Sequence, residues 1–231
     1  MPNGVHGALL TRALARLPTM LPRLVPIAPQ GARRRVGLRF VTVTEATAPQ
    51  PALLPVRTSR LVLRTYRDED LEPLLDYYAD PEVARFLLEE AWTREDAEAQ
   101  LALRRQRTGI EGPASALALV VEHEGTVVGD VALWTTGDTV SRGEVGWAFH
   151  PGYGGRGFAT EALRSLLGIA FDRYRMHRVV AQLDARNEPS ARLCERVGMQ
   201  REGHLRADWW SKGEWTDTLV YGMLQREWQR P

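Results

Sequence analysis

The sequence contains almost no cysteine and almost no lysine. Cys194 is the single cysteine, so the chain cannot form an internal disulfide, and a reducing cytoplasm is its simplest location. Lys212 is the single lysine, which excludes the Gly-Lys-Ser/Thr signature of a Walker phosphate loop. The five histidines are not spaced as metal ligands, and we predict no metal site. No apolar run approaches the ~20 residues that span a bilayer, so we predict no membrane partner.

Acidic residues are absent from the first 44 positions, which carry seven arginines, although the whole chain has a net charge of only +1. We expect no DNA partner. Three interpretations of this basic segment are open: an import signal, a contact with RNA or an acidic membrane through Arg33-Arg34-Arg35, or a disordered or mis-started extension. We adopt the third, because the segment contains no catalytic motif. The composition changes before Arg60, so we expect a basic, Pro-rich extension over 1–56 and one domain over 57–231.

The most informative feature present is a glycine-rich turn between a strand and a helix. Residues 144–150 alternate apolar side chains with small or polar ones, as strands do, and apolar residues recur at helical spacing over 159–170. Gly154, Gly155 and Gly157 therefore lie at a helix N-terminus, where unpaired N–H groups and the helix dipole favour a phosphate. A Rossmann fingerprint needs such a turn in the first strand–helix unit, whereas this one lies two-thirds of the way along the chain.

A second strand and helix follow the turn. Residues 178–183 have a strand pattern, and Asn187-Glu188-Pro189-Ser190 begins a helix that stops at Gly198. The order of these motifs, with Glu144-Val145-Gly146-Trp147 and Gly155-Arg156-Gly157-Phe158-Ala159-Thr160-Glu161-Ala162, resembles the GNAT acetyltransferase family. The most similar branch includes the ribosomal-protein alanine N-acetyltransferases of the RimJ/RimL type. The resemblance covers roughly Thr58 to Trp228.

The resemblance and the hydrophobic pattern together predict an α+β fold. We expect an α/β/α sandwich in which a mixed, mostly antiparallel GNAT sheet is flanked by helices. The strands at 144–150 and 178–183 flank a helix over 157–173, so they should be parallel and joined by a right-handed crossover. The other expected elements are a strand over 60–66, a helix over 71–78, a helix over 94–107 with a capping box of Thr93 and Asp96, and hairpins over 117–134 and 200–225.

The resemblance implies acetyl-coenzyme A as the cosubstrate. In this family the strand ending at His150 parts from the strand beginning near Arg178, and pantetheine fills the gap. N–H groups near Trp147 to Phe149 would polarise the thioester, and the N–H groups from Tyr153 to Thr160 would bind the pyrophosphate. The family usually has Gln or Arg where Gly152 stands, so we expect weaker binding. The expected cofactor-binding residues are Trp147, Ala148, Phe149, His150, Tyr153, Gly154, Gly155, Arg156, Gly157, Phe158, Ala159, Thr160 and Asn187.

Three residues are candidates for proton transfer. Glu144 could take the proton of the amine, or it could be a structural group bonded to neighbouring backbone. Ser190 stands where the RimJ/RimL branch has the proton donor to the thiolate, and it would serve equally as a helix cap. Cys194 stands where many relatives carry a tyrosine acid, although a lone helical cysteine is more often a small buried hydrophobe.

We therefore expect an N-acetyltransferase that moves an acetyl group from acetyl-CoA to a primary amine by direct attack in a ternary complex. The expected acceptor is a protein or peptide N-terminal α-amine, and the expected assembly is a monomer or homodimer. A small-molecule amine such as an aminoglycoside or polyamine is the alternative acceptor, and a non-catalytic CoA-binding module is the alternative to an enzyme. Trp209, Trp210 and Trp215 flank the last turn and would either wall the acceptor site or pack on the hairpin.

Overall fold

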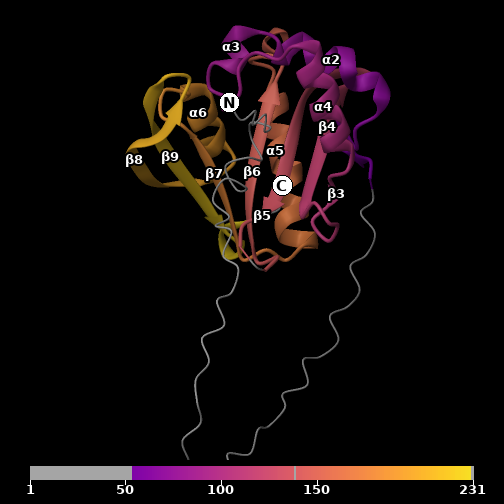
Figure 1. The fold of residues 1–231 in the computed structure, drawn as a ribbon. Coiled ribbons are helices and arrows are strands. Elements are labelled where there is room, and N and C mark those ends of the chain that lie inside the picture. Colours follow the sequence, from indigo (N-terminus) through magenta and orange to yellow (C-terminus); the bar gives the residue numbers. More distant parts are fainter. Residues whose placement is uncertain (1–53, 138, 230–231) are drawn as a thin grey trace, which may run out of the picture.

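The computed structural model describes residues 54–137 and 139–229 (Figure 1). The basic extension predicted over 1–56 lies almost entirely outside the described residues, and the expected domain boundary at 57 stays a prediction. The first strand spans Val56–Arg57, so a boundary at residue 57 would divide it. Within the described ranges, no helix is long and apolar enough to cross a membrane.

A mixed sheet of nine strands forms the centre of the described part of the chain. The order across the sheet is β1-β2-β4-β5-β6-β7-β9-β8, and β3 pairs with β4. Among these strands only the β6–β7 pair is parallel. The strands are β1 (Val56–Arg57), β2 (Val62–Arg64), β3 (Thr108–Gly109), β4 (Ala116–His123), β5 (Thr126–Thr135), β6 (Arg142–Phe149), β7 (Arg178–Asp184), β8 (Gln200–Ser211) and β9 (Glu214–Leu224).

Helices cover both faces of this sheet (Figure 1). One hydrophobic core joins α5 (Phe158–Gly168) and α6 (Glu188–Arg196) to the first face. A second core joins α2 (Leu71–Tyr78) and α4 (Arg94–Arg105) to the other face, and the short α3 (Pro81–Ala84) follows α2. On β4, Leu117 and Leu119 enter the first core, whereas Ala118 and Val120 enter the second. The strand is apolar at successive positions because both of its faces are buried.

A buried ion pair fixes α2 and α4 to the middle of the sheet. Asp130 of β5 accepts hydrogen bonds from the hydroxyls of Tyr77 and Tyr78, at 2.6 and 2.9 Å. Arg104 of α4 donates to the same carboxylate at 3.1 Å, and its guanidinium lies over the ring of Trp92. Removal of one charge would leave the other buried without compensation, so the pair holds the helical layer in one place beside β6.

The predicted α+β fold is confirmed, and so are the longer elements. The helix expected over 94–107 is α4, and its capping box is present because Thr93 and Asp96 each bond the backbone N–H of the other. The helix expected over 157–173 is α5, continued by a π-helical turn at Ile169–Arg173. Sequence analysis missed β1, β3 and α3, which have two, two and four residues and are too short for a periodic pattern.

Candidate active site

Strands β6 and β7 are paired at only one end. Arg142, Gly143 and Glu144 pair with Arg178, Val179 and Val180, and the ladder stops there. Beyond that point β6 stays paired with β5, and β7 stays paired with β9. The two strands therefore diverge, as the sequence analysis predicted, and leave an opening between residues 145–149 and 181–184, which we call the β6–β7 opening.

The backbone of β6 presents alternate N–H groups to this opening. The N–H of His150 donates to the carbonyl of Val128 on the β5 side, at 3.0 Å. N–H groups alternate between the two edges of a strand, so Ala148 also faces β5, whereas Trp147 and Phe149 face the opening. Of the backbone donors expected to polarise the thioester, only the N–H groups of Trp147 and Phe149 face the opening. The N–H groups of Ala148 and His150 point away from any ligand in the opening.

The glycine turn connects β6 to α5 through a short 3₁₀ turn, Pro151–Tyr153. Gly155 and Gly157 have φ values of +74° and +80°, a region that residues with a Cβ rarely adopt, and Gly157 is the N-cap of α5. Among the described residues, no acceptor bonds the N–H groups of positions 155–160. These groups form the cradle expected at a helix N-terminus.

The beginning of the turn is already hydrogen-bonded within the chain. Tyr153 N–H donates to the carbonyl of His150 at 3.1 Å, and Gly154 N–H donates to that of Pro151 at 2.9 Å. These two backbone donors are therefore not available to a phosphate, contrary to the expectation from the sequence. Gly152 N–H donates to His150 Nδ1 at 2.9 Å, and a Cβ at position 152 would lie 3.0 Å from that ring. The unusual glycine is explained by the imidazole that folds over it.

A hollow of about 730 Å³ lies beside the glycine turn. Its wall includes Gly155, Gly157 and the first turn of α5, together with three arginines from separate elements. These arginines are Arg60, Arg164 and Arg196. The hollow therefore combines unpaired backbone donors with cationic side chains, which is the chemistry that a diphosphate requires.

Glu144 lies where the strands begin to part, on the face of the sheet that α2 and α4 cover. Its side chain is only 4% exposed, and Gln182 Nε2 is 3.3 Å from both carboxylate oxygens. Glu144, Gln182 and Trp209 line a second cavity of about 40 Å³, and residues 85–88 form part of its wall. A cavity of this size holds two or three waters. A buried carboxylate beside a small wet space can accept a proton directly or through water.

The three tryptophans of the last hairpin have different environments. Trp209 lines the cavity of Glu144. Trp210 and Trp215 are paired across β8 and β9, with their rings 5.5 Å apart, and both are exposed. Of the three tryptophans expected to wall the acceptor site, only Trp209 lines the cavity beside Glu144.

Ser190 and Asn187 lie on the opposite face, at the start of α6. Asn187 Oδ1 accepts the N–H of Ser190 at 3.1 Å, so the amide oxygen of Asn187 is used as a helix cap. The indole N–H of Trp147 donates to Ser190 Oγ at 3.2 Å and so links β6 to α6. The hydroxyl of Ser190 accepts this bond, which leaves its own proton available for donation.

Cys194 does not fit the role of a proton donor. Its side chain is fully buried in the first hydrophobic core. Burial raises the pKa of the thiol to about 12. Donation would create a thiolate in an apolar core, so we assign Cys194 to packing.

Sequence reasoning did not identify several residues that define these cavities. Gln182 and the segment 85–88 carry no motif, and they reach Glu144 only through the tertiary fold. Asp76 of α2 lies 2.9 Å from His150 Nε2 and fixes the imidazole over Gly152. In the described part of the chain, no group of three or more His, Cys, Asp or Glu side chains could hold a metal ion, and the absence of a metal stays a prediction.

Comparison with protein families and curated proteins gives consistent matches. The model of the acetyltransferase (GNAT) domain family matches residues 60–200. The chain is 28% identical over 173 residues to the uncharacterized N-acetyltransferase YnaD of Bacillus subtilis, covering 75% of this chain and 98% of that protein. It is 26% identical over 182 residues to the ribosomal protein uS5 alanine N-acetyltransferase of Escherichia coli, covering 74% and 91% respectively.

Solved structures share the fold. A GNAT-family acetyltransferase from Bacillus anthracis aligns with a TM-score of 0.66 and 27% identity, covering 74% of this chain and 99% of that one. Spermidine N-acetyltransferase from Vibrio cholerae, solved with CoA and spermine, aligns with a TM-score of 0.63 and 21% identity, covering 74% and 98%. At that identity the second likeness shows the fold alone.

Proposed function

The chain belongs to the GNAT acetyltransferase family and is an N-acetyltransferase that uses acetyl-CoA, and we propose that its acceptor is the α-amino group of a protein or peptide. The observation that carries the proposed transfer to an amine is the position of Glu144. Its buried carboxylate stands where β6 and β7 part and lines the small cavity on the far face of the sheet. Cofactor and acceptor can therefore meet at this point from opposite faces.

The residues of the chain fit acetyl-CoA in a specific orientation. The pyrophosphate would bind the N–H groups of positions 155–160, which no described acceptor bonds, beside the arginine-lined hollow. Pantetheine would run through the β6–β7 opening against the free backbone edge of β6, with Asn187 on the far wall. This direction brings the thioester towards the N–H groups of Trp147 and Phe149, which would stabilise the oxyanion.

The transfer itself needs one base and one acid. The amine attacks the thioester carbonyl, so that a C–N bond forms and the C–S bond breaks. Glu144 takes the proton that the amine loses, and Ser190 gives a proton to the departing thiolate. A proton from solvent then restores the hydroxyl of Ser190. Ser190 is held for this step by the indole of Trp147.

The choice of an α-amine follows from the energetics of the nucleophile. An α-amine has an ordinary pKa near ~7.7–8.0 and lysine one near ~10.4, so the neutral amine costs lysine about 3–4 kcal/mol more at pH 7. The similarity to the uS5 alanine N-acetyltransferase supports the same acceptor class. A polyamine is the alternative, because a spermidine N-acetyltransferase shares the fold.

A peptide with a free N-terminus and an internal lysine tests the acceptor. After incubation with the full chain and acetyl-CoA, tandem mass spectrometry should locate the acetyl group on the α-amine. The same peptide with a blocked N-terminus is the control and should stay unmodified. Acetylation of the lysine alone would contradict the proposal, and transfer only to spermidine in a parallel reaction would support the alternative.

A further inference from the structure

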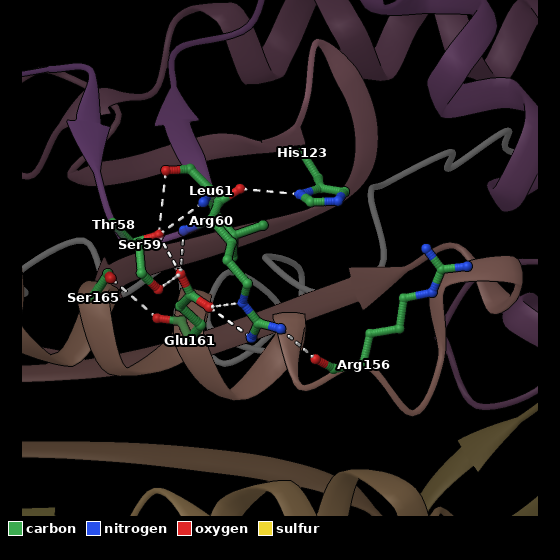
Figure 2. Close-up of polar contacts among 8 residues, drawn as sticks. All are labelled: Thr58, Ser59, Arg60, Leu61, His123, Arg156, Glu161 and Ser165. Atoms are coloured by element: carbon green, nitrogen blue, oxygen red, sulfur yellow. Dashed lines mark hydrogen bonds and ion pairs between the residues drawn. The ribbon is translucent and has the colours of Figure 1, made fainter.

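A cluster of polar residues joins the segment between β1 and β2 to the first turn of α5 (Figure 2). Glu161 Oε1 accepts hydrogen bonds from the hydroxyls of Thr58 and Ser59 and from the N–H of Arg60, at 2.5, 2.9 and 3.0 Å. Glu161 Oε2 accepts from Arg60 Nε at 2.8 Å and forms an ion pair with its guanidinium. We call residues 58–60 and Glu161 the clasp. It joins two segments about 100 positions apart in the sequence.

The clasp also reaches the glycine turn. The second terminal nitrogen of Arg60 donates to the carbonyl of Arg156 at 2.9 Å (Figure 2). Arg60 is itself held in place, because its guanidinium lies over the ring of Phe158 and His123 Nδ1 lies 3.1 Å from its backbone carbonyl. The position of the Arg156 carbonyl is thus fixed from outside the turn.

Fixing this carbonyl orients a phosphate donor. In a trans peptide the C=O and N–H groups point in opposite directions, so an Arg156 carbonyl held towards Arg60 directs the N–H of Gly157 away from it. Gly155 and Gly157 lie on either side of Arg156, and glycines permit the required positive φ values without enforcing them. A reversed peptide would present a carbonyl oxygen where a phosphate should bind.

We propose that Arg60 is a positioning residue for coenzyme A, which holds the glycine turn in its diphosphate-binding conformation while Glu161 serves as its anchor. This inference rests on the cofactor site of the proposed function and adds a residue outside the glycine motif. The gain in affinity comes from preorganisation, because the turn has less conformational freedom to lose on binding.

The alternative is that Arg60 attracts phosphate only by its charge. Glu161 opposes that role, since its hydrogen bonds with Thr58 and Arg60 lower its pKa to about 2 and keep it anionic beside Arg60. Arg164 lines the same hollow, and among the described residues no acidic side chain pairs with it. Arg164 therefore provides a control of equal charge that does not touch the Arg156 carbonyl.

Glu161→Gln separates the two explanations by the sign of its effect. If Arg60 acts by charge, removal of the neighbouring anion should tighten CoA binding. If Arg60 acts by position, loss of the anchor should weaken CoA binding by about tenfold. Calorimetry with CoA and the full chain measures this without any acceptor amine, so the result does not depend on which amine is acetylated.

Arg60→Met and Arg164→Met complete the test. Arg60→Met should weaken CoA binding by about tenfold or more and raise the KM for acetyl-CoA with little change in kcat, and the loss should persist in 0.5 M salt. The loss in Arg164→Met should be smaller and should shrink with salt. Thermal melting of each variant verifies folding. Equal, salt-suppressed losses in both arginine variants, or tighter binding in Glu161→Gln, would overturn the proposal, whereas a wild-type chain that does not bind CoA would refute the cofactor site instead.

Discussion

At the scale of single residues, burial and neighbours distinguish candidates that the sequence leaves equal. Glu144 and Cys194 are both almost fully buried. Glu144 faces a small cavity with polar groups in its wall, whereas Cys194 lies within the first hydrophobic core. Only the first environment allows a proton to reach the side chain, so Glu144 is the better base and Cys194 is a packing residue.

Glu144→Gln tests the proposed base through the pH dependence of the rate. Without a base, the amine must lose its proton in solution, and the neutral fraction falls tenfold for each unit below its pKa. We expect kcat/KM to fall by about 10²-fold or more near pH 6 and by less near pH 9. Glu144→Asp keeps the carboxylate but shortens the side chain by one methylene, so it should recover part of the rate. A pH–rate profile of Glu144→Gln that overlies the wild-type profile would assign the base elsewhere.

At the scale of elements, the sequence predicts what depends on local pattern and misses what depends on distant contacts. The helical spacing after Gly157 and the capping box of Thr93 are local, and both predicted elements formed. Residues 85–88, which line the Glu144 cavity, follow the four-residue α3, and this part of the chain has no periodic pattern. The clasp was not predicted either, because Thr58, Ser59 and Arg60 contact Glu161 only in the tertiary fold.

The clasp should make part of the stability of the fold dependent on pH. The pKa of Glu161 is about 2 in the folded chain and 4.5 in its ordinary state. A lowered pKa means that the stabilisation is fully present above about pH 4.5 and is lost as the pH falls towards 2. Glu161→Gln should therefore lower the free energy of unfolding at pH 7, and its difference from wild type should narrow at pH 3. Urea unfolding at both pH values measures this. Glu98→Gln, an exposed change on α4, should show no such narrowing, and a constant deficit for Glu161→Gln would contradict the assignment.

At the scale of the whole molecule, the sheet separates the phosphate-binding residues from Glu144 and its cavity, and the β6–β7 opening connects the two sides. The glycine turn, α5 and α6 present phosphate donors on one face, and Glu144, Trp209 and residues 85–88 line the small cavity on the other. The resemblance in the sequence implied that the strands part, but it could not say which backbone donors stay free. That depends on the register between β5 and β6, which sets Trp147 and Phe149 towards the opening.

The same architecture predicts how much of the chain catalysis requires. Leu54 and Val56 pack against the first core, β1 pairs with β2, and Thr58 to Arg60 form the clasp, so residues 54–60 are needed for the described fold. A truncated chain of residues 54–231 should keep the kcat and the KM for acetyl-CoA of the full chain.

A chain of residues 61–231 loses β1 and the clasp together, and its KM for acetyl-CoA should rise by about tenfold or more where it still folds. Circular dichroism and steady-state kinetics of both chains provide the measurement. A well-folded 54–231 chain without turnover would show that residues 1–53 complete the active site, because no part of the clasp or of either core would then be missing.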